Sequence, residues 1–300
     1  MPAAQVLLLM LGGCLGGIGV LDRFVANTDA NDDDSGSKWS LTGLFRYLRK
    51  HHTDAEVQSV WEGIKDIVIK TVISAESCVN TQVKMHVPHR ANCYELYGFD
   101  ILLDKRLKPW LLEVNTGPDL ATASPLDKKI KYNLVTDLFN LVGFMPVNRK
   151  SCERQMEERK KSRLLHRPSV ANGGSSAAQN YARVHEFLKS DSVKEWWRYL
   201  TPEAITVLQE SEEELARCRT FERIFPTASE STQYYLSLFP TKRYYNACLA
   251  EWVRCGPKMP KAAKEMVGLK PGYDWAGYRT PMTVAERLDL CALLPTAFDA

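Results

Sequence analysis

The sequence has almost no charge imbalance, no paired cysteine motif and no long apolar segment. Lysine and arginine number 39 against 36 aspartates and glutamates, which leaves a formal net charge of +3. Such a balance disfavours the strongly basic surface of a nucleic-acid-binding domain, so we expect no nucleic-acid partner. The eight cysteines contain no C-x-x-C pair. Their spacing disfavours a zinc ribbon or a disulfide scaffold and favours a reducing compartment.

The longest uncharged apolar segment, residues 6–21, is too short for an ordinary membrane span. As a helix it would reach about 24 Å at about 1.5 Å per residue, short of the roughly 30 Å hydrocarbon core. Five glycines weaken it as a helix, and the preceding MPAAQ lacks the basic residues of a signal peptide. A membrane or secretory role is therefore disfavoured, and we interpret residues 1–23 as a divergent apolar N-terminus.

The common nucleotide-binding and hydrolase motifs are also missing. There is no P-loop, no G-x-G-x-x-G and no G-x-S-x-G. His86 and His89 stand three residues apart without a third ligand, which is typical of ordinary loop histidines. Any nucleotide or metal site must therefore be built from a less common pattern.

The composition and the helix signals indicate a folded chain. Hydrophobic residues make up 45% and charged residues 25% of the 300 residues, a length that suits two domains of roughly 150 residues each. Apolar spacing at Leu41, Leu44, Phe45 and Leu48 predicts a helix that begins after Ser37 as its cap, and a second helix is expected from Asp54 to about Glu76. A third helix is expected to begin after Ser124 and to end at Gly143.

The character of the chain changes near residue 149. Residues 149–167 carry eight basic and three acidic side chains, and a segment rich in small residues follows. Beyond it, residues 182–200 and 202–218 have helical spacing, the latter with Thr201 as its cap. The units expected after the first domain are a basic and then flexible linker over 149–180, a helical extension over 181–256 and a loosely ordered tail over 257–300.

The most informative segment is ELYGFDILLDKRLKPWLLEVN, residues 95–115. Two strand-like stretches flank the polar turn 104–107, which predicts a β-hairpin. If that turn is the whole loop, Leu103 faces Lys108 and Asp100 faces Leu111. One face of the hairpin would then be apolar, formed by Phe99, Ile101, Leu103, Trp110, Leu112 and Val114.

The opposite face of the predicted hairpin holds Asp100, Glu113 and Asn115, with Glu113 diagonal to Asp100. Diagonal neighbours are about 7–8 Å apart at the backbone, so these side chains could converge on one ion. Two carboxylates and an amide oxygen suit Mg²⁺ better than Zn²⁺. The alternative is a hairpin whose polar face meets only water, and a one-residue slip in register would separate Asp100 from the other two.

Three segments carry a longer pattern: residues 95–115, SPLDKKIK at 124–131 and NLVGF at 140–144. They resemble the C-terminal part of the catalytic domain in the tubulin-tyrosine-ligase-like family, especially in its tubulin polyglutamylases. The resemblance covers residues 24–148 well, and FERIFP at 221–226 is similar to a segment that follows this domain. It implies an α+β fold: the C-terminal portion of an ATP-grasp fold, made of helices and an antiparallel hairpin, and then an α-helical extension.

The resemblance also implies a chemistry. Such enzymes use ATP and Mg²⁺ to activate a carboxylate as an acyl-phosphate, and they couple it to an amine. The expected function is a tubulin polyglutamylase that joins L-glutamate to tubulin tails, at cytoplasmic microtubules, the cilium or the basal body. By motif position, Asp100, Glu113 and Asn115 match Mg²⁺ ligands and Lys131 matches a lysine that helps to hold the incoming glutamate. Without the resemblance, Lys131 would be interpreted as part of a solvated helix face.

The N-terminal residues differ from the family pattern, and this difference lowers the activity that we expect. Residues 1–23 do not resemble the nucleotide-binding lobes that should precede residue 24, so we expect an N-terminally truncated copy with weak or no catalysis. No catalytic or ATP-binding residue is carried over. Two alternatives remain open: a non-enzymatic microtubule-associated protein that uses the basic run 149–167, and a ligase of the same family that adds another amino acid.

Overall fold

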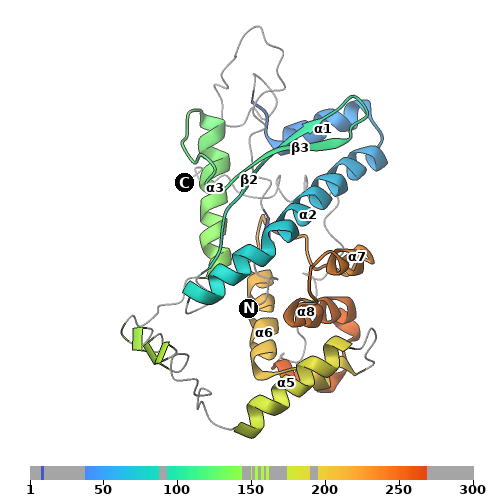
Figure 1. Ribbon diagram of the computed structural model, residues 1–300. Helices are drawn as coiled ribbons and strands as arrows, with labels where there is room; N and C mark the ends of the chain where they lie inside the picture. Colours follow the sequence, from blue (N-terminus) through green and yellow to red (C-terminus); the bar gives the residue numbers. More distant parts are fainter. Residues whose placement is uncertain are drawn as a thin grey trace.

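The computed structural model describes residues 8–9, 38–87, 93–143, 174–189 and 195–268, with a few positions between 150 and 161 (Figure 1). Its first part contains helices α1 (Leu41–His51) and α2 (Asp54–His86), the antiparallel strands β2 (Gly98–Leu103) and β3 (Pro109–Asn115), and helix α3 (Pro125–Val142). This mixture of helices and a hairpin confirms the α+β class. No helix in the described ranges is both long and apolar enough to span a bilayer.

The second part is helical, as predicted. It contains α5 (Gly174–Lys189), the 3₁₀ helix η3 (Trp196–Tyr199), α6 (Pro202–Ala216), α7 (Ser231–Ser237), α8 (Tyr244–Cys255), the 3₁₀ helix η4 (Gly256–Lys258) and α9 (Lys261–Val267). A two-residue strand, β4 (Glu222–Arg223), pairs with β1 (Leu8–Leu9). Helix α5 begins inside the stretch where a flexible linker is predicted.

Local capping explains where the helices begin. The Ser40 hydroxyl accepts a hydrogen bond from the Gly43 amide, so α1 begins three residues later than the Ser37 cap predicts. Thr53 and Glu56 form a capping box at the start of α2. Helix α3 begins after Ser124 and ends at the left-handed Gly143, as predicted.

Helix α2 is the central element of the fold, and its 33 residues extend past the predicted end at Glu76. Its first half packs against α1, where the rings of Phe45 and Trp61 meet edge to face at 5.4 Å. The inner face of the hairpin covers the same cluster with Ile101 and Leu103. The hairpin therefore has one face on the core, which leaves its other face open.

Most of the C-terminal helices have a core of their own, and the segment 221–239 packs that part against the first one. Ile224 and Phe225 join the middle of α2 in one buried cluster, and Phe221 packs against α3. Ion pairs cross the same boundary: Lys65 contacts Glu222 at 3.1 Å, and Arg243 contacts Glu76 at 2.9 Å. In Figure 1, α6 continues below α3 and α7 lies beside α2.

Order continues past residue 257, where a loosely ordered tail is predicted. Met259, Ala263 and Val267 are buried against the cluster formed by α6 and α8. The side-chain amide of Gln209 donates to the Val267 carbonyl at 2.8 Å and so fixes the end of α9. The loosely ordered interpretation is therefore wrong for residues 258–268.

We expect the stability of this helical core to fall at alkaline pH. Burial raises the pKa of the Cys248 thiol to about 12, and it also raises the pKa values of Tyr235 and Tyr244. The unfolded chain releases these protons at about pH 8.5–10, before the folded chain does. The free energy of unfolding should therefore be unaffected by these groups below about pH 8 and decrease as the pH rises toward 12.

Urea denaturation at several pH values between about 8 and 10.5 measures this effect. Tyr235→Phe removes one of the titrating groups and should flatten the pH dependence. A denaturation midpoint that stays constant across the range would contradict the prediction.

Candidate functional site

The turn of the hairpin is longer than predicted, and this changes the register beside it. The Asp104 carboxylate accepts hydrogen bonds from the amides of Arg106 and Lys108 and from the Trp110 indole nitrogen. The Asp104 amide in turn donates to the Lys108 carbonyl. Lys108 thus belongs to the turn, and Leu103 faces Pro109 rather than Lys108. These hydrogen bonds hold the pKa of the Asp104 carboxyl below its ordinary value.

A β-bulge then changes the register a second time. Ile101 pairs with Leu111, but Asp100 pairs with Glu113, so Leu112 is the extra residue on β3. The predicted pairing of Asp100 with Leu111 is therefore wrong, and Glu113 lies directly opposite Asp100 instead of diagonal to it. The bulge keeps both carboxylates on one face despite the shifted turn.

The predicted apolar face is only half correct. Phe99, Ile101 and Leu103 are partly buried against α2, as expected. On β3, however, Trp110 is 48% and Leu112 is 63% exposed. The one-residue shift at the turn accounts for this, because it moves Trp110 opposite Leu102 on the outward side.

The three predicted metal ligands lie together on the open face. Directly paired residues have Cβ atoms about 4.5–5.5 Å apart, so Asp100 and Glu113 are side-chain neighbours. The Asn115 amide donates to Glu113 Oε1 at 3.2 Å. Partial burial and the adjacent Glu113 raise the pKa of Asp100. All three side chains are exposed, so a ligand can reach them.

The donor set contains only oxygen ligands: two carboxylates and one amide. In the described part of the chain, no three His, Cys, Asp or Glu side chains gather as a metal-binding group. Because all three donors are oxygen atoms, the cluster would suit a hard divalent cation better than zinc or a softer metal. Two carboxylates held side by side repel one another, and a cation between them would relieve that repulsion.

The loop after β3 connects this cluster to the region of Lys131. An ideal Cβ at Gly98 would lie 3.1 Å from Pro118 and 3.7 Å from the Asn115 Cβ. A glycine at this position therefore lets Pro118 approach β2 closely. The start of the loop is anchored on the hairpin, and its end is the N-terminus of α3.

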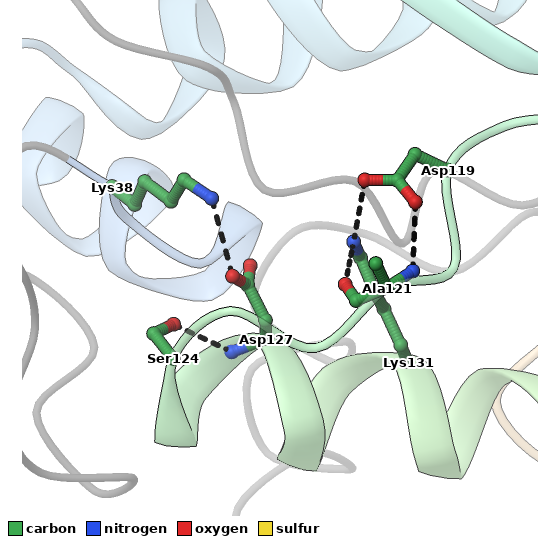
Figure 2. A network of polar contacts seen from close by, with 6 residues as sticks. All are labelled: Lys38, Asp119, Ala121, Ser124, Asp127 and Lys131. Atoms are coloured by element: carbon green, nitrogen blue, oxygen red, sulfur yellow. Dashed lines mark hydrogen bonds and ion pairs between the residues drawn. The ribbon is translucent and has the colours of Figure 1, made fainter.

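Lys131 is not the solvated lysine that its helix position alone suggests, because its side chain is only 17% exposed. Its ammonium donates to the Ala121 carbonyl and lies 3.9 Å from Asp119 Oδ2 (Figure 2). Among the described residues, no hydrogen bond or ion pair joins it to Asp100, Glu113 or Asn115. The structure thus places the candidate metal ligands and Lys131 at the two ends of one loop.

Two charged residues near Lys131 were not identified from the sequence. Asp127 is 1% exposed and pairs with Lys38 at 3.1 Å, while its amide donates to the Ser124 hydroxyl (Figure 2). Asp127 suits the first turn of α3 because its amide binds the Ser124 cap. Its ion pair with Lys38 could not be predicted in the same way, because the two residues are 89 positions apart in the sequence. No sequence pattern identifies Asp119. Its partners, the Ala121 amide and Lys131, come close to it only through the path of the loop and its junction with α3.

The chain is similar in sequence to known proteins over about three quarters of its length. Residues 21–152 match the profile of the tubulin-tyrosine ligase family. The chain is 36% identical over 242 residues to the tubulin monoglutamylase TTLL4 of Homo sapiens, an alignment that covers 76% of the chain and 20% of that relative. It is 37% identical over 243 residues to the tubulin polyglutamylase TTLL5 of Mus musculus, covering 76% and 18%.

A nematode relative covers a larger share of its own length. The tubulin polyglutamylase ttll-4 of Caenorhabditis elegans is 32% identical over 217 residues, which is 72% of this chain and 35% of the relative. The chain spans about a fifth of the human and mouse relatives. The alignments extend well beyond the family match, so they also include part of the C-terminal helices.

Proposed function

We propose that the chain is part of an ATP-dependent ligase that joins glutamate to tubulin, because residues 21–152 match the profile of the tubulin-tyrosine ligase family. Relatives named as tubulin monoglutamylases and polyglutamylases align with about three quarters of the chain. In this proposal, residues 24–148 form the C-terminal portion of an ATP-grasp fold. The segment 221–239 would add to its core, because Ile224 and Phe225 pack on α2 and Phe221 packs on α3.

The observation that carries the proposal is the cluster on the open face of the hairpin. Asp100 and Glu113 would hold Mg²⁺ with their carboxylates, and the Asn115 side-chain oxygen would complete the set. When bound, Mg²⁺ would neutralise charge on the nucleotide phosphates during phosphoryl transfer to a carboxylate. Phe99, Ile101 and Leu103 pack β2 against the clusters of α2, which fixes the strand that carries Asp100.

Lys131 supplies the second part of the proposed chemistry. Its mostly buried stem and its hydrogen bond to the Ala121 carbonyl limit the positions that the ammonium can reach. An ammonium with further donor capacity can bind a carboxylate of the incoming glutamate. Tubulin is the proposed acceptor and microtubules are the proposed setting, including those of a cilium or a basal body.

Incorporation of radiolabelled glutamate into tubulin tests this function. The full chain is incubated with Mg²⁺, ATP, tubulin and glutamate, and tubulin is then separated and counted. We expect incorporation at a low rate, consistent with the weak catalysis predicted from the sequence, and it should require all four components. Lys131→Met should raise the KM for glutamate by roughly tenfold or more, whereas the same change at the exposed Lys128 should not.

Other outcomes of this assay would support other functions. Absence of incorporation combined with co-sedimentation on microtubules would favour a non-enzymatic microtubule-binding role. Incorporation of glycine or tyrosine in place of glutamate would reject glutamate as the substrate and would keep the family chemistry.

A further inference from the structure

Lys131 has a carboxylate beside it that the proposed function does not yet use. Asp119 lies on the loop between β3 and α3 and is 80% exposed. It is the residue after Pro118, which is anchored on the hairpin at Gly98. An exposed acid could be an ordinary loop residue, so its hydrogen bonds decide whether it can have a more specific role.

One residue, Ala121, holds both charged groups. Its amide donates to Asp119 Oδ1 at 2.8 Å, and its carbonyl accepts from the Lys131 ammonium (Figure 2). The two side chains are therefore each tied to the same backbone segment and do not depend on one another. Their charged ends lie 3.9 Å apart, beyond hydrogen-bond distance.

Because of this separation, the Asp119 carboxylate and the Lys131 ammonium can each form further hydrogen bonds with a ligand. Within the described ranges, Asp119 Oδ2 accepts no hydrogen bond, because only Oδ1 is engaged by Ala121. The lysine ammonium has three N–H donors, and the Ala121 carbonyl takes one of them. A cation and an anion thus stand side by side, each with an unused position toward solvent.

A free α-amino acid carries the complementary pair of charges, a carboxylate and an ammonium on one carbon. We propose that Lys131 and Asp119 form a zwitterion-binding pair, in which Lys131 binds the carboxylate of the incoming amino acid and Asp119 binds its ammonium. This inference rests on the proposed function for Lys131 and adds Asp119 as a specificity-determining residue. It predicts selection of a free amino acid over a dicarboxylic acid of the same length.

Binding of L-glutamate and of glutarate, which lacks the ammonium, tests the pair in the full chain by calorimetry. Asp119→Asn keeps an oxygen that can accept from the Ala121 amide, so the loop should keep its conformation. We expect this variant to weaken glutamate binding by roughly three- to tenfold and to leave glutarate binding within about twofold. Lys131→Met should weaken binding of both ligands.

A matched control is Glu265→Gln, which neutralises another exposed carboxylate next to a lysine, on α9. It should change neither affinity. If Asp119→Asn tightens binding of both ligands, Asp119 is only a counter-ion that competes for Lys131, and the zwitterion pair is rejected. If it leaves both unchanged while Lys131→Met weakens both, only the role of Asp119 fails. If Lys131→Met has no effect either, the proposed substrate site itself fails.

Discussion

Exchange of Asp100 and Glu113 for their amides should lower the proposed ligase activity by about a hundredfold or more. Mg²⁺ stabilises transferring phosphoryl groups by several kcal/mol, and a loss of about 1.4 kcal/mol already corresponds to tenfold in rate. Asp100→Asn and Glu113→Gln keep the shape of the side chains and remove the negative charges that attract the cation. The bulged pairing should persist, because it is defined by backbone hydrogen bonds.

Binding of Mn²⁺, a paramagnetic substitute for Mg²⁺, should be measured together with the rate. The double variant should lose ion binding along with glutamate incorporation into tubulin. Glu95→Gln is the matched control, because Glu95 is an exposed carboxylate three residues before β2. If the double variant binds Mn²⁺ as the wild type does, the hairpin cluster is not the cation site, whatever happens to the rate.

Lys65→Met, which removes the cation from the Lys65–Glu222 pair, should destabilise the fold by about 3–5 kcal/mol. Both side chains are almost fully buried, at 4% and 5% exposed, and they lie 3.1 Å apart. Lys65→Met would leave the Glu222 carboxylate beneath the surface with its nearest cation removed. Glu222→Leu should cost less, because Lys65 also pairs with the half-exposed Glu62 at 2.9 Å. A typical domain has about 5–15 kcal/mol of stability in total, so Lys65→Met should remove a large share of it.

The double variant distinguishes this cause from general disruption. Lys65→Met with Glu222→Leu replaces the pair by apolar side chains, so it should be clearly more stable than either single variant. Urea denaturation measures the three free energies of unfolding. Lys261→Met, in the exposed pair with Glu265, serves as the control and should have no measurable effect.

The same variants test whether the two parts of the chain unfold together. Lys65 lies on α2 and Glu222 on β4, 157 residues later. Hydrogen exchange should show that α2 and α7 lose protection in parallel in the single variants, because one buried cluster joins Ile224, Phe225 and Tyr235 to the middle of α2. Loss of protection in only one part would show that the helices after residue 195 are an independent unit.

Short-range sequence patterns were sufficient to predict the limits of α3 and the shared face of the hairpin's polar residues. Ser124, Pro125 and Gly143 define the limits of α3, because capping depends on residues within one helical turn. The alternation of Asp100, Glu113 and Asn115 along two strands predicted their shared face, since side chains alternate with a period of two. The family resemblance was likewise present in continuous segments of sequence.

Tertiary structure alone decided how these parts meet. The bulge at Leu112 depends on the turn around Asp104 and on packing against α2, so strand alternation could not locate it. The Lys65–Glu222 and Lys38–Asp127 pairs join residues far apart in the chain, where no short-range pattern exists. The net charge of +3 does not indicate where charged side chains gather. The fold decides this for Asp119 and Lys131, whose charged atoms lie 3.9 Å apart.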